Sequence, residues 1–298
     1  MTEENYVTYK GIRHFVKTEI RSKLIVEDTE FKRVEYKEKN LIIQERDLTS
    51  IEDIKGLEKL WDLDRLQILS DKISEISGLD DLINLKSLFI SSLSGKQTSH
   101  ITEISGLEKL TNLKYLNLGN NNINSIKGLE NLINLKELNL YTNNIKEIKG
   151  IKFLKNLENL DLGYNNISEI KGLENLSNLK SLSLEYNNIS EIKGLEHLTN
   201  LKELDLSHNQ ITNIQGLEGL KSLYKLILVN NQISEINGLE SLKDLEYLDL
   251  SNNRIEDITW FKTQKSIPRL WNLYLYGNPC TEEKLNDLKE DIDFKSRL

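Results

Sequence analysis

Residues 113–134 read LKYLNLGNNNINSIKGLENLIN, and this phrase returns with small changes along most of a 298-residue chain. Glycine marks the repeat most clearly, because it recurs every 22 residues from Gly106 to Gly238. Around the glycines the spacing L-x-x-L-x-L-x-x-N-x-I-x-x-I is kept. A fixed period of this length indicates short structural units, here called coils, that stack on one another around a shared core.

The first half of each coil predicts a short strand with a tight exit. Leu116 and Leu118 are two residues apart, so their side chains point to one side of a strand while Asn117 points to the other. Asn121 follows where the chain must leave the strand. An inward-facing amide there can satisfy backbone groups that burial would otherwise leave unpaired. We expect the same role for Asn143, Asn165, Asn187, Asn209, Asn231, Asn253 and Asn278.

The second half of each coil predicts the opposite side of the body. Leu129, Leu132 and Leu135 are three residues apart, which suits 3₁₀ turns better than a full α-helix. Parallel strands of successive coils lie about 4.8 Å apart, so the strand side is tightly spaced and should be concave. The turns then form the convex side.

This pattern resembles the leucine-rich repeat proteins of the short, 22-residue class, typified by the regulatory subunit of protein phosphatase type 1. The final L-x-L-x-G-N-P, from Leu273 to Pro279, resembles the capping motif of that class. Bacterial internalin-type adhesins share the repeat length, although they are secreted and surface-anchored. The resemblance implies an α/β solenoid: a right-handed horseshoe with a parallel concave sheet, a mostly 3₁₀ or irregular convex side and a C-terminal helical cap.

Three parts are expected along the chain. Residues 41–280 form the leucine-rich repeat solenoid, and residues 281–298 form a C-terminal cap helix, with Thr281 as its N-cap. Residues 1–40 do not follow the repeat, and we interpret them as an N-terminal cap or a small module. One coil is six residues longer than the others, and we expect the polar segment Ser91–His100 to be a mobile loop that the fold does not need.

Two structures fit the pattern within residues 1–40. Apolar alternation around Lys23–Val26 and Phe31–Tyr36 predicts short strands or a hairpin. The alternative is one amphipathic helix, whose apolar face would carry Ile12, Phe15, Val16 and Ile20.

The composition excludes several classes of function. A net charge of −8 argues against nucleic acid as a partner, because phosphate binding needs clustered Lys and Arg. The single cysteine, Cys280, excludes a disulfide framework. No apolar targeting region follows Met1 and no stretch is apolar enough to span a membrane, so we expect a cytoplasmic monomer that binds no membrane.

No motif points to catalysis. The phosphate-binding pattern G-x-x-x-x-G-K-[ST], a G-x-G-x-x-G after a strand, H-E-x-x-H and paired C-x-x-C are all missing from the sequence. His208 lies near Asp205 and Glu185, but a single histidine at the rim is a poor basis for a metal site. We therefore predict no enzymatic activity, no cofactor and no metal.

The residues that alternate with the strand leucines point outward, and they combine tyrosines with acids. Aromatic side chains among acids are typical of a protein-binding surface whose partner carries a basic patch. A merely solvated face is the competing interpretation. The predicted partner-binding residues are Tyr141, Asp161, Tyr164, Glu185, Tyr186, Glu203, Asp205, Ile227, Tyr247, Asp249 and Tyr274.

Two functions fit these residues. The first is a non-catalytic scaffold that binds a protein on its acidic, tyrosine-rich concave face and regulates an enzyme such as a phosphatase or a GTPase. The alternative is an internalin-like surface adhesion module.

Overall fold

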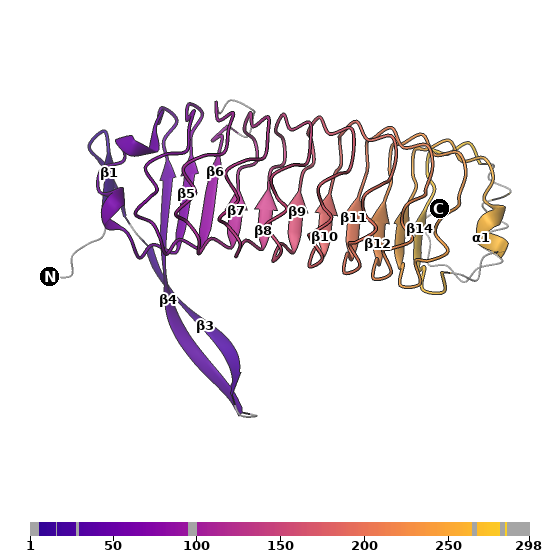
Figure 1. Ribbon diagram of the computed structural model, residues 1–298, viewed down its shortest axis with the longest axis horizontal. Coiled ribbons are helices and arrows are strands. Elements are labelled where there is room, and N and C mark those ends of the chain that lie inside the picture. Colours follow the sequence, from indigo (N-terminus) through magenta and orange to yellow (C-terminus); the bar gives the residue numbers. More distant parts are fainter. Residues whose placement is uncertain are drawn as a thin grey trace.

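The computed structural model describes residues 6–15, 17–27, 30–94, 100–263, 267–280 and 284. Within these ranges the chain forms one elongated solenoid, and a two-stranded arm projects from it near the N-terminal end (Figure 1). The cap helix predicted over residues 281–298 lies outside the described ranges except for Lys284, so it stays a prediction. Most of the predicted Ser91–His100 loop, residues 95–99, lies outside them as well.

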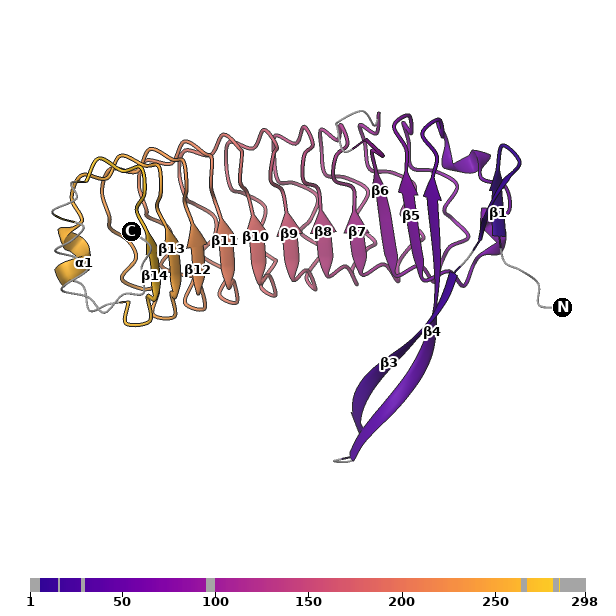
Figure 2. The ribbon, with the colours of Figure 1, turned by 180° about the vertical axis from the view of Figure 1, so that it is seen from behind.

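A 12-stranded sheet runs along the described part of the solenoid, with its strands in chain order. From β4 to β14 every neighbouring pair is parallel, as the repeat predicted, and the strands lie side by side along the body (Figure 2). Their bounds are β4 Glu30–Gln44, β5 Arg65–Leu69, β6 Ser87–Ser91, β7 Tyr115–Asn117, β8 Glu137–Asn139, β9 Asn159–Asp161, β10 Ser181–Ser183, β11 Glu203–Asp205, β12 Lys225–Ile227, β13 Tyr247–Asp249 and β14 Asn272–Tyr274.

The core is a stack of apolar layers in strict register. Leu116 is paired with Leu138, and Leu138 with Leu160, and each of these side chains is almost fully buried. The strands pair without any shift in register. Residues at equivalent positions of the repeat therefore lie next to one another in neighbouring coils. The repeat therefore fixes the register of the outward-facing residues too.

The predicted row of inward-facing asparagines, here called the asparagine ladder, is confirmed from Asn143 onward, whereas Asn121 donates through Nδ2 but its Oδ1 atom has no hydrogen-bond partner among the described residues. The Asn165 Nδ2 atom donates to the carbonyl oxygens of Leu140 and Leu162, both at 3.0 Å, and Oδ1 accepts from the Ile145 N–H at 2.9 Å. One buried side chain thus satisfies backbone groups of its own coil and of the preceding coil. The same three bonds recur at Asn143, Asn187, Asn209, Asn231, Asn253 and Asn278.

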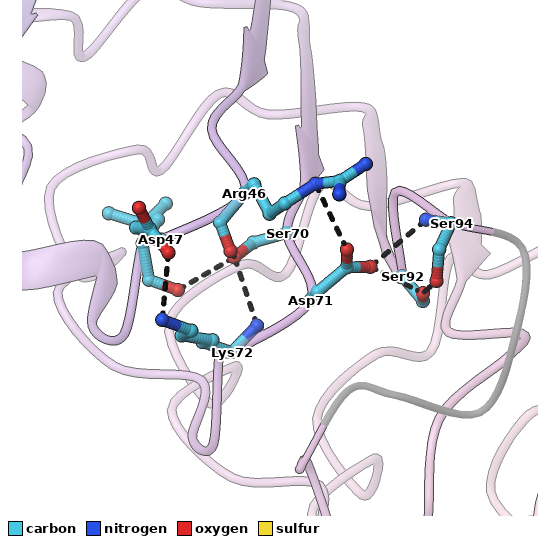
Figure 3. A network of polar contacts seen from close by, with 8 residues as sticks. Arg46, Asp47, Ser70, Asp71, Lys72, Ser92 and Ser94 are labelled. Carbon is cyan, nitrogen blue, oxygen red and sulfur yellow. Dashed lines mark hydrogen bonds and ion pairs between the residues drawn. The ribbon is translucent and has the colours of Figure 1, made fainter.

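Asp71 occupies the ladder position in an early coil, where it cannot donate as an amide does. Its Oδ1 atom instead accepts from the Ser92 hydroxyl at 2.8 Å and from the Ser94 N–H at 2.9 Å (Figure 3). Arg46 lies 3.5 Å from the other carboxylate oxygen, and the Ser70 hydroxyl donates to carbonyls of the preceding coil. The start of the predicted loop is therefore tied to the solenoid.

The side opposite the strands is built of turns, as the three-residue leucine spacing predicted. Leu132 N–H donates to the Leu129 carbonyl and Leu135 N–H to the Leu132 carbonyl, both at 3.0 Å. Two short 3₁₀ helices, η1 (Ile51–Asp53) and η2 (Leu57–Lys59), occur in the first coils. The last coil begins at Leu270, three residues later than the 22-residue spacing from Leu245 predicts, and a short α-helix that the sequence did not predict, α1 (Thr259–Thr263), lies before it.

The repeated glycine is required by both conformation and space. Gly150 has φ +89°, in the left-handed region, and a Cβ built there would lie 2.0 Å from the Ile126 carbonyl oxygen. Any side chain at this position would collide with the backbone of the preceding coil.

In several coils the glutamate two residues after the repeated glycine accepts a hydrogen bond from the N–H of that glycine. Glu174 Oε1 accepts from the Gly172 N–H at 3.0 Å, while Lys171 pairs with Glu169. The pairs Lys149–Glu147 and Lys193–Glu191 likewise lie within one coil, whereas Lys109 pairs with Asp80 of the preceding coil.

The N-terminal segment is built of strands, so the helical alternative is wrong for the described residues. Strands β1 (Tyr6–Tyr9) and β2 (Ile12–Phe15) form an antiparallel hairpin that buries Val7 and is hydrogen-bonded to the first coil through Thr8. Strand β3 (Lys17–Glu27) pairs with β4 to form the arm. Strand β4 runs without interruption through position 40/41, where a boundary was expected, and its last five residues pair with β5.

Replacing one ladder amide should cost far more stability than replacing a convex charge. We expect Asn165→Ala to lower the free energy of unfolding by about 1–3 kcal/mol, because it leaves buried backbone groups without partners. The exposed control Lys171→Ala should stay within about 0.5 kcal/mol of the parent. Urea denaturation of both variants measures the difference, and equal midpoints would contradict the structural role of the ladder.

Candidate partner-binding face

The outward residues of the strands stand in columns, because the register repeats in every coil. One column contains Asp161, Ser183 and Asp205, and it continues through Ile227 to Asp249. A second column contains Glu203, Lys225 and Tyr247. Both columns lie on the face opposite the leucine core. The structure places the residues of these columns side by side on one surface. That this surface binds a partner stays a prediction.

A row of aromatic side chains follows the strands at the edge where the chain leaves the sheet. The ring centroids of Tyr164 and Tyr186 are 3.9 Å apart, and those of Tyr186 and His208 are 3.7 Å apart, with near-parallel planes. Tyr141 lies 5.0 Å from Tyr164 at a tilt. We call these four residues the aromatic ridge. Sequence analysis placed three of them in the binding set but treated His208 as an isolated rim histidine, since ring stacking is not visible in the repeat pattern.

Three ridge residues have an unusual backbone conformation. Tyr164, Tyr186 and His208 have φ values of 52°, 52° and 54°, which lie in the left-handed region that bulky residues disfavour. The equivalent positions of other coils carry Asn120, Thr142, Asn230 and Asn252, also with positive φ. Asparagine tolerates this conformation better than tyrosine does. Three of these seven positions thus carry asparagine, and the ridge places two tyrosines and a histidine at others.

Gly163 makes room for the first ring of the ridge. A Cβ built on Gly163 would lie 3.0 Å from Tyr141 Cδ2 and 3.0 Å from Glu185 Cγ. The Tyr141 ring and the aliphatic part of Glu185 thus close over this glycine from the two neighbouring coils. The arrangement brings a carboxylate beside the ridge.

Three carboxylates of neighbouring coils influence one another next to the ridge. Burial, followed by the charges of Asp205 and Asp161, raises the pKa of the Glu185 carboxyl. Burial also raises the pKa of Asp161, and the Gly163 N–H and the Ser183 hydroxyl oppose this effect. The charge of Asp205 thus makes both Glu185 and Asp161 harder to ionise, and we call Asp161, Glu185 and Asp205 the acid cluster.

The aspartates of the acid cluster also have a structural role that the sequence analysis missed. Asp161 Oδ1 accepts from the Gly163 N–H at 3.0 Å, and Asp205 Oδ1 accepts from the Ser207 N–H at 2.9 Å. Asp249 repeats this contact. An Asp or Asn two residues before a turn is the usual signal for such bonds. The same signal was visible in the sequence at Asn117 and Asn139, whose side chains cap their own turns.

Asn230 closes the ridge at its far end. Its side-chain amide lies 2.9 Å from His208 Nε2, within hydrogen-bonding distance. Burial lowers the pKa of His208, although Asp205 opposes this. The ridge therefore adds no positive charge to offset the acid cluster at neutral pH.

The C-terminal part of the face is electrically more balanced. Glu203 lies 3.9 Å from Lys225 and also accepts from the Tyr224 hydroxyl. The Lys225 ammonium lies 5.6 Å from the centroid of the Tyr247 ring, which in turn lies 5.2 Å from that of Tyr274. The side chain of Ile227, predicted to be exposed, is only partly accessible between its neighbours. The predicted residues thus form two groups: the ridge tyrosines with the acid cluster, and the C-terminal group around Glu203, Tyr247 and Tyr274.

The face is hollowed along the strands. A depression of about 300 Å³ is lined by outward residues of β6 to β10, including Phe89 and Asp161. A smaller one of about 180 Å³ continues over Asp205 and Ile227. A third, open depression of about 410 Å³ follows the ridge and is lined by Tyr164, Tyr186 and His208 among others. An extended segment of a partner could lie along these hollows.

The described part of the chain contains neither a metal-ligand cluster nor a helix that could span a membrane. No group of three or more His, Cys, Asp or Glu side chains is placed there to hold a metal ion. Likewise, no helix among the described residues is long and apolar enough to cross a membrane.

Comparison with known proteins agrees with the repeat architecture. A family model described as leucine-rich repeats, in units of two copies, matches overlapping segments that together cover residues 111–263. The chain belongs to the leucine-rich repeat family. Proteins of this family are generally protein-interaction modules and are typically non-catalytic. The finer resemblance to the regulatory subunit of protein phosphatase type 1 stays a prediction.

Solved structures of internalins are similar to this chain. An internalin (inlF) from Listeria monocytogenes is 29% identical with a TM-score of 0.66, and the match covers 86% of this chain and 79% of that chain. Internalin C2 (inlC2) from the same organism is 32% identical with a TM-score of 0.57, covering 66% of this chain and 82% of that one. The functional domain of InlJ, at 20% identity with a TM-score of 0.60 and covering 82% and 54%, shares the fold alone. A search of curated proteins finds no match.

Removing one charge from the acid cluster should stabilise the protein at neutral pH. The pKa of Glu185 is raised in the folded state, so its ionised form opposes folding once the pH exceeds that pKa. We expect Glu185→Gln to raise the urea midpoint at pH 7. The gain should vanish at about pH 3, where the carboxyl is protonated in both the folded and unfolded states.

The matched control is Glu130→Gln, on an exposed turn of the opposite side. Its midpoint should not change at either pH. A gain for Glu185→Gln that persists at the lower pH would show that packing, and not charge, is responsible.

Proposed function

We propose that the protein is a non-catalytic interaction module that binds another protein on its strand face, the side predicted to be concave. The observation that carries this proposal is the pairing of the aromatic ridge with the acid cluster on one hollowed surface. Exposed tyrosines offer large contact area with few rotatable bonds, which is how binding hot spots are usually composed. A solvated face has no need of aromatic side chains in a disfavoured backbone conformation.

The charges on this face support a basic partner. Glu203 is already paired with Lys225, whereas among the described residues the charges that raise the pKa of Glu185 are those of Asp205 and Asp161. A partner with Lys or Arg side chains would relieve this repulsion. Such complementarity speeds association and fixes orientation more than it adds affinity.

The similarity to internalins favours one form of this proposal. At 32% identity over 82% of internalin C2, the likeness supports an adhesion module that recognises a protein on another surface. The other form is a cytoplasmic scaffold that regulates an enzyme such as a phosphatase or a GTPase. Finding which protein is captured, by cross-linking on intact cells and in lysates, separates these two forms.

Binding should depend on the strand face and not on the opposite side. Once a partner is identified by cross-linking and mass spectrometry, we expect Tyr247→Ala to weaken its affinity by about tenfold, as for a typical aromatic anchor. Asp205→Asn should slow association while keeping the Asx bond to Ser207. Surface plasmon resonance at two salt concentrations measures both effects, and higher salt should slow association further.

Lys171→Ala is the control on the opposite side and should leave the kinetics unchanged. If this variant abolishes binding while the strand-face variants bind as the parent does, the proposed surface is wrong.

A further inference from the structure

The depression of about 300 Å³ over β6 to β10 differs in chemistry from the rest of the strand face, and we call it the polar hollow. Its volume is at the lower end of the range of roughly 300–1,000 Å³ that small-ligand sites occupy. Its lining includes no residue of the aromatic ridge. Amides and hydroxyls predominate, with the amides of Asn117, Asn139 and Asn159 on three successive strands, while Phe89 and Tyr115 lie at the N-terminal end.

The amides of the polar hollow combine fixed positions with unused hydrogen-bonding groups. Asn117 Oδ1 accepts from the Gly119 N–H at 3.0 Å, and Asn139 Nδ2 donates to Asp161 Oδ2 at 3.1 Å. These contacts hold the side chains in one orientation, so a ligand need not order them on binding. Among the described residues, the Asn117 Nδ2 group and the whole Asn159 amide form no hydrogen bond. They are therefore offered to a ligand.

The two aromatic residues give the polar hollow an apolar end. Tyr115 is 40% exposed, and Phe89 is half-buried on the neighbouring strand. Phe89 is paired in register with Asn117, and Tyr115 with Glu137, so each ring stands beside a polar side chain. A matching ligand must present an apolar surface and several hydrogen-bonding groups within the width of a few strands.

We propose that the polar hollow binds an uncharged pyranose unit of an oligosaccharide. Each sugar hydroxyl is a donor and an acceptor at once, and the amide of Asn is a side chain that offers both functions. The C–H groups of a pyranose ring form an apolar surface that rests on the electron-rich face of an aromatic ring. The inference goes beyond the proposed function, because an oligosaccharide can bind here without a protein partner.

The charges of the polar hollow select against acidic sugars. Its charged lining residues are Glu137 and Asp161, and no Lys or Arg is among them. Carboxylates accept hydrogen bonds from hydroxyls, but they repel a uronate or another acidic sugar across a few ångströms. The ligand is therefore neutral.

The spacing of the coils disfavours an extended peptide as the ligand of the polar hollow. A peptide laid across the strands repeats its carbonyl and side-chain directions about every 6.6 Å, whereas neighbouring strands are about 4.8 Å apart. It would lose register with the amides after one or two coils. A compact ring that fits between neighbouring amides meets no such mismatch.

Oligosaccharide titrations test the chemistry directly with the full chain. The neutral probes are linear tetrasaccharides of glucose, galactose, mannose and N-acetylglucosamine. A hyaluronan tetrasaccharide is the charged probe, because it alternates N-acetylglucosamine with a uronate. Ligand-observed NMR should show at least one neutral probe binding with a dissociation constant of about 1 mM or tighter, and the hyaluronan probe at least about tenfold more weakly. Failure of all four neutral probes to bind, or equal affinity for hyaluronan, would overturn the inference.

Two variants locate the binding, and each has a control at the same repeat position outside the polar hollow. Tyr115→Ala and Asn159→Ala should each weaken the best neutral probe by about fivefold, through loss of the aromatic surface or of amide hydrogen bonds. Tyr247→Ala on β13 and Asn272→Ala on β14 should leave its affinity unchanged. Equal urea midpoints for variant and parent exclude unfolding as the cause. Equal losses in the variants and their controls would refute the site.

The same variants separate this inference from the proposed function. If no neutral probe binds while Tyr247→Ala weakens the protein partner, the sugar site is wrong and the proposed function stands. If Tyr115→Ala weakens the sugar while no strand-face variant affects the protein partner, the sugar site stands and the proposed function is wrong.

Discussion

The fold depends on one interaction, the buried amide that Asn165 and its equivalents place between successive coils. A chain that turns out of a strand every 22 residues would bury carbonyl and N–H groups at each exit. The amide supplies two donors and one acceptor at that point, so each coil satisfies its own backbone and that of its neighbour. Because the contact joins neighbouring coils, it also prevents slippage between them. Where Asp71 replaces the amide, the neighbouring Ser70 hydroxyl donates to the Leu48 carbonyl, and Ser92 and Ser94 of the next coil donate to the Asp71 carboxylate.

Strict register has a direct consequence for the candidate site. Side chains far apart in sequence, such as Tyr141 and His208, become members of one row because each stands at an equivalent or adjacent point of its own coil. Their stacking cannot be disturbed by sliding one coil past another. The framework thus gives the ridge and the acid cluster a fixed geometry, and variation among the outward residues changes the surface without changing the fold.

The sequence predicted the repeated part of the molecule well, because residues at equivalent positions of the repeat have the same neighbours in every coil. The parallel strands, the ladder at Asn165 and the turns at Leu129 follow from spacing alone. Other features arise from contacts that no period encodes. The stacking of Tyr186 on His208, the pairing of Glu203 with Lys225 and the turn-capping of Asp205 depend on which side chains happen to be neighbours in adjacent coils. In residues 1–40 there is no repeat, so strand and helix could not be separated until β3 and β4 were seen to pair.

The arm is joined to the solenoid in a way that has mechanical meaning. Strand β4 enters the sheet as the unbroken continuation of the arm, and residues Asn40–Gln44 are held by hydrogen bonds to Arg65–Leu69. A pull on the tip, directed along β4, would load these bonds in shear and all at once, whereas a sideways pull would open them one by one. The arm is thus continuous with a strand of the solenoid sheet. Tension applied to the arm would act directly on the hydrogen bonds between β4 and β5, with no hinge between them.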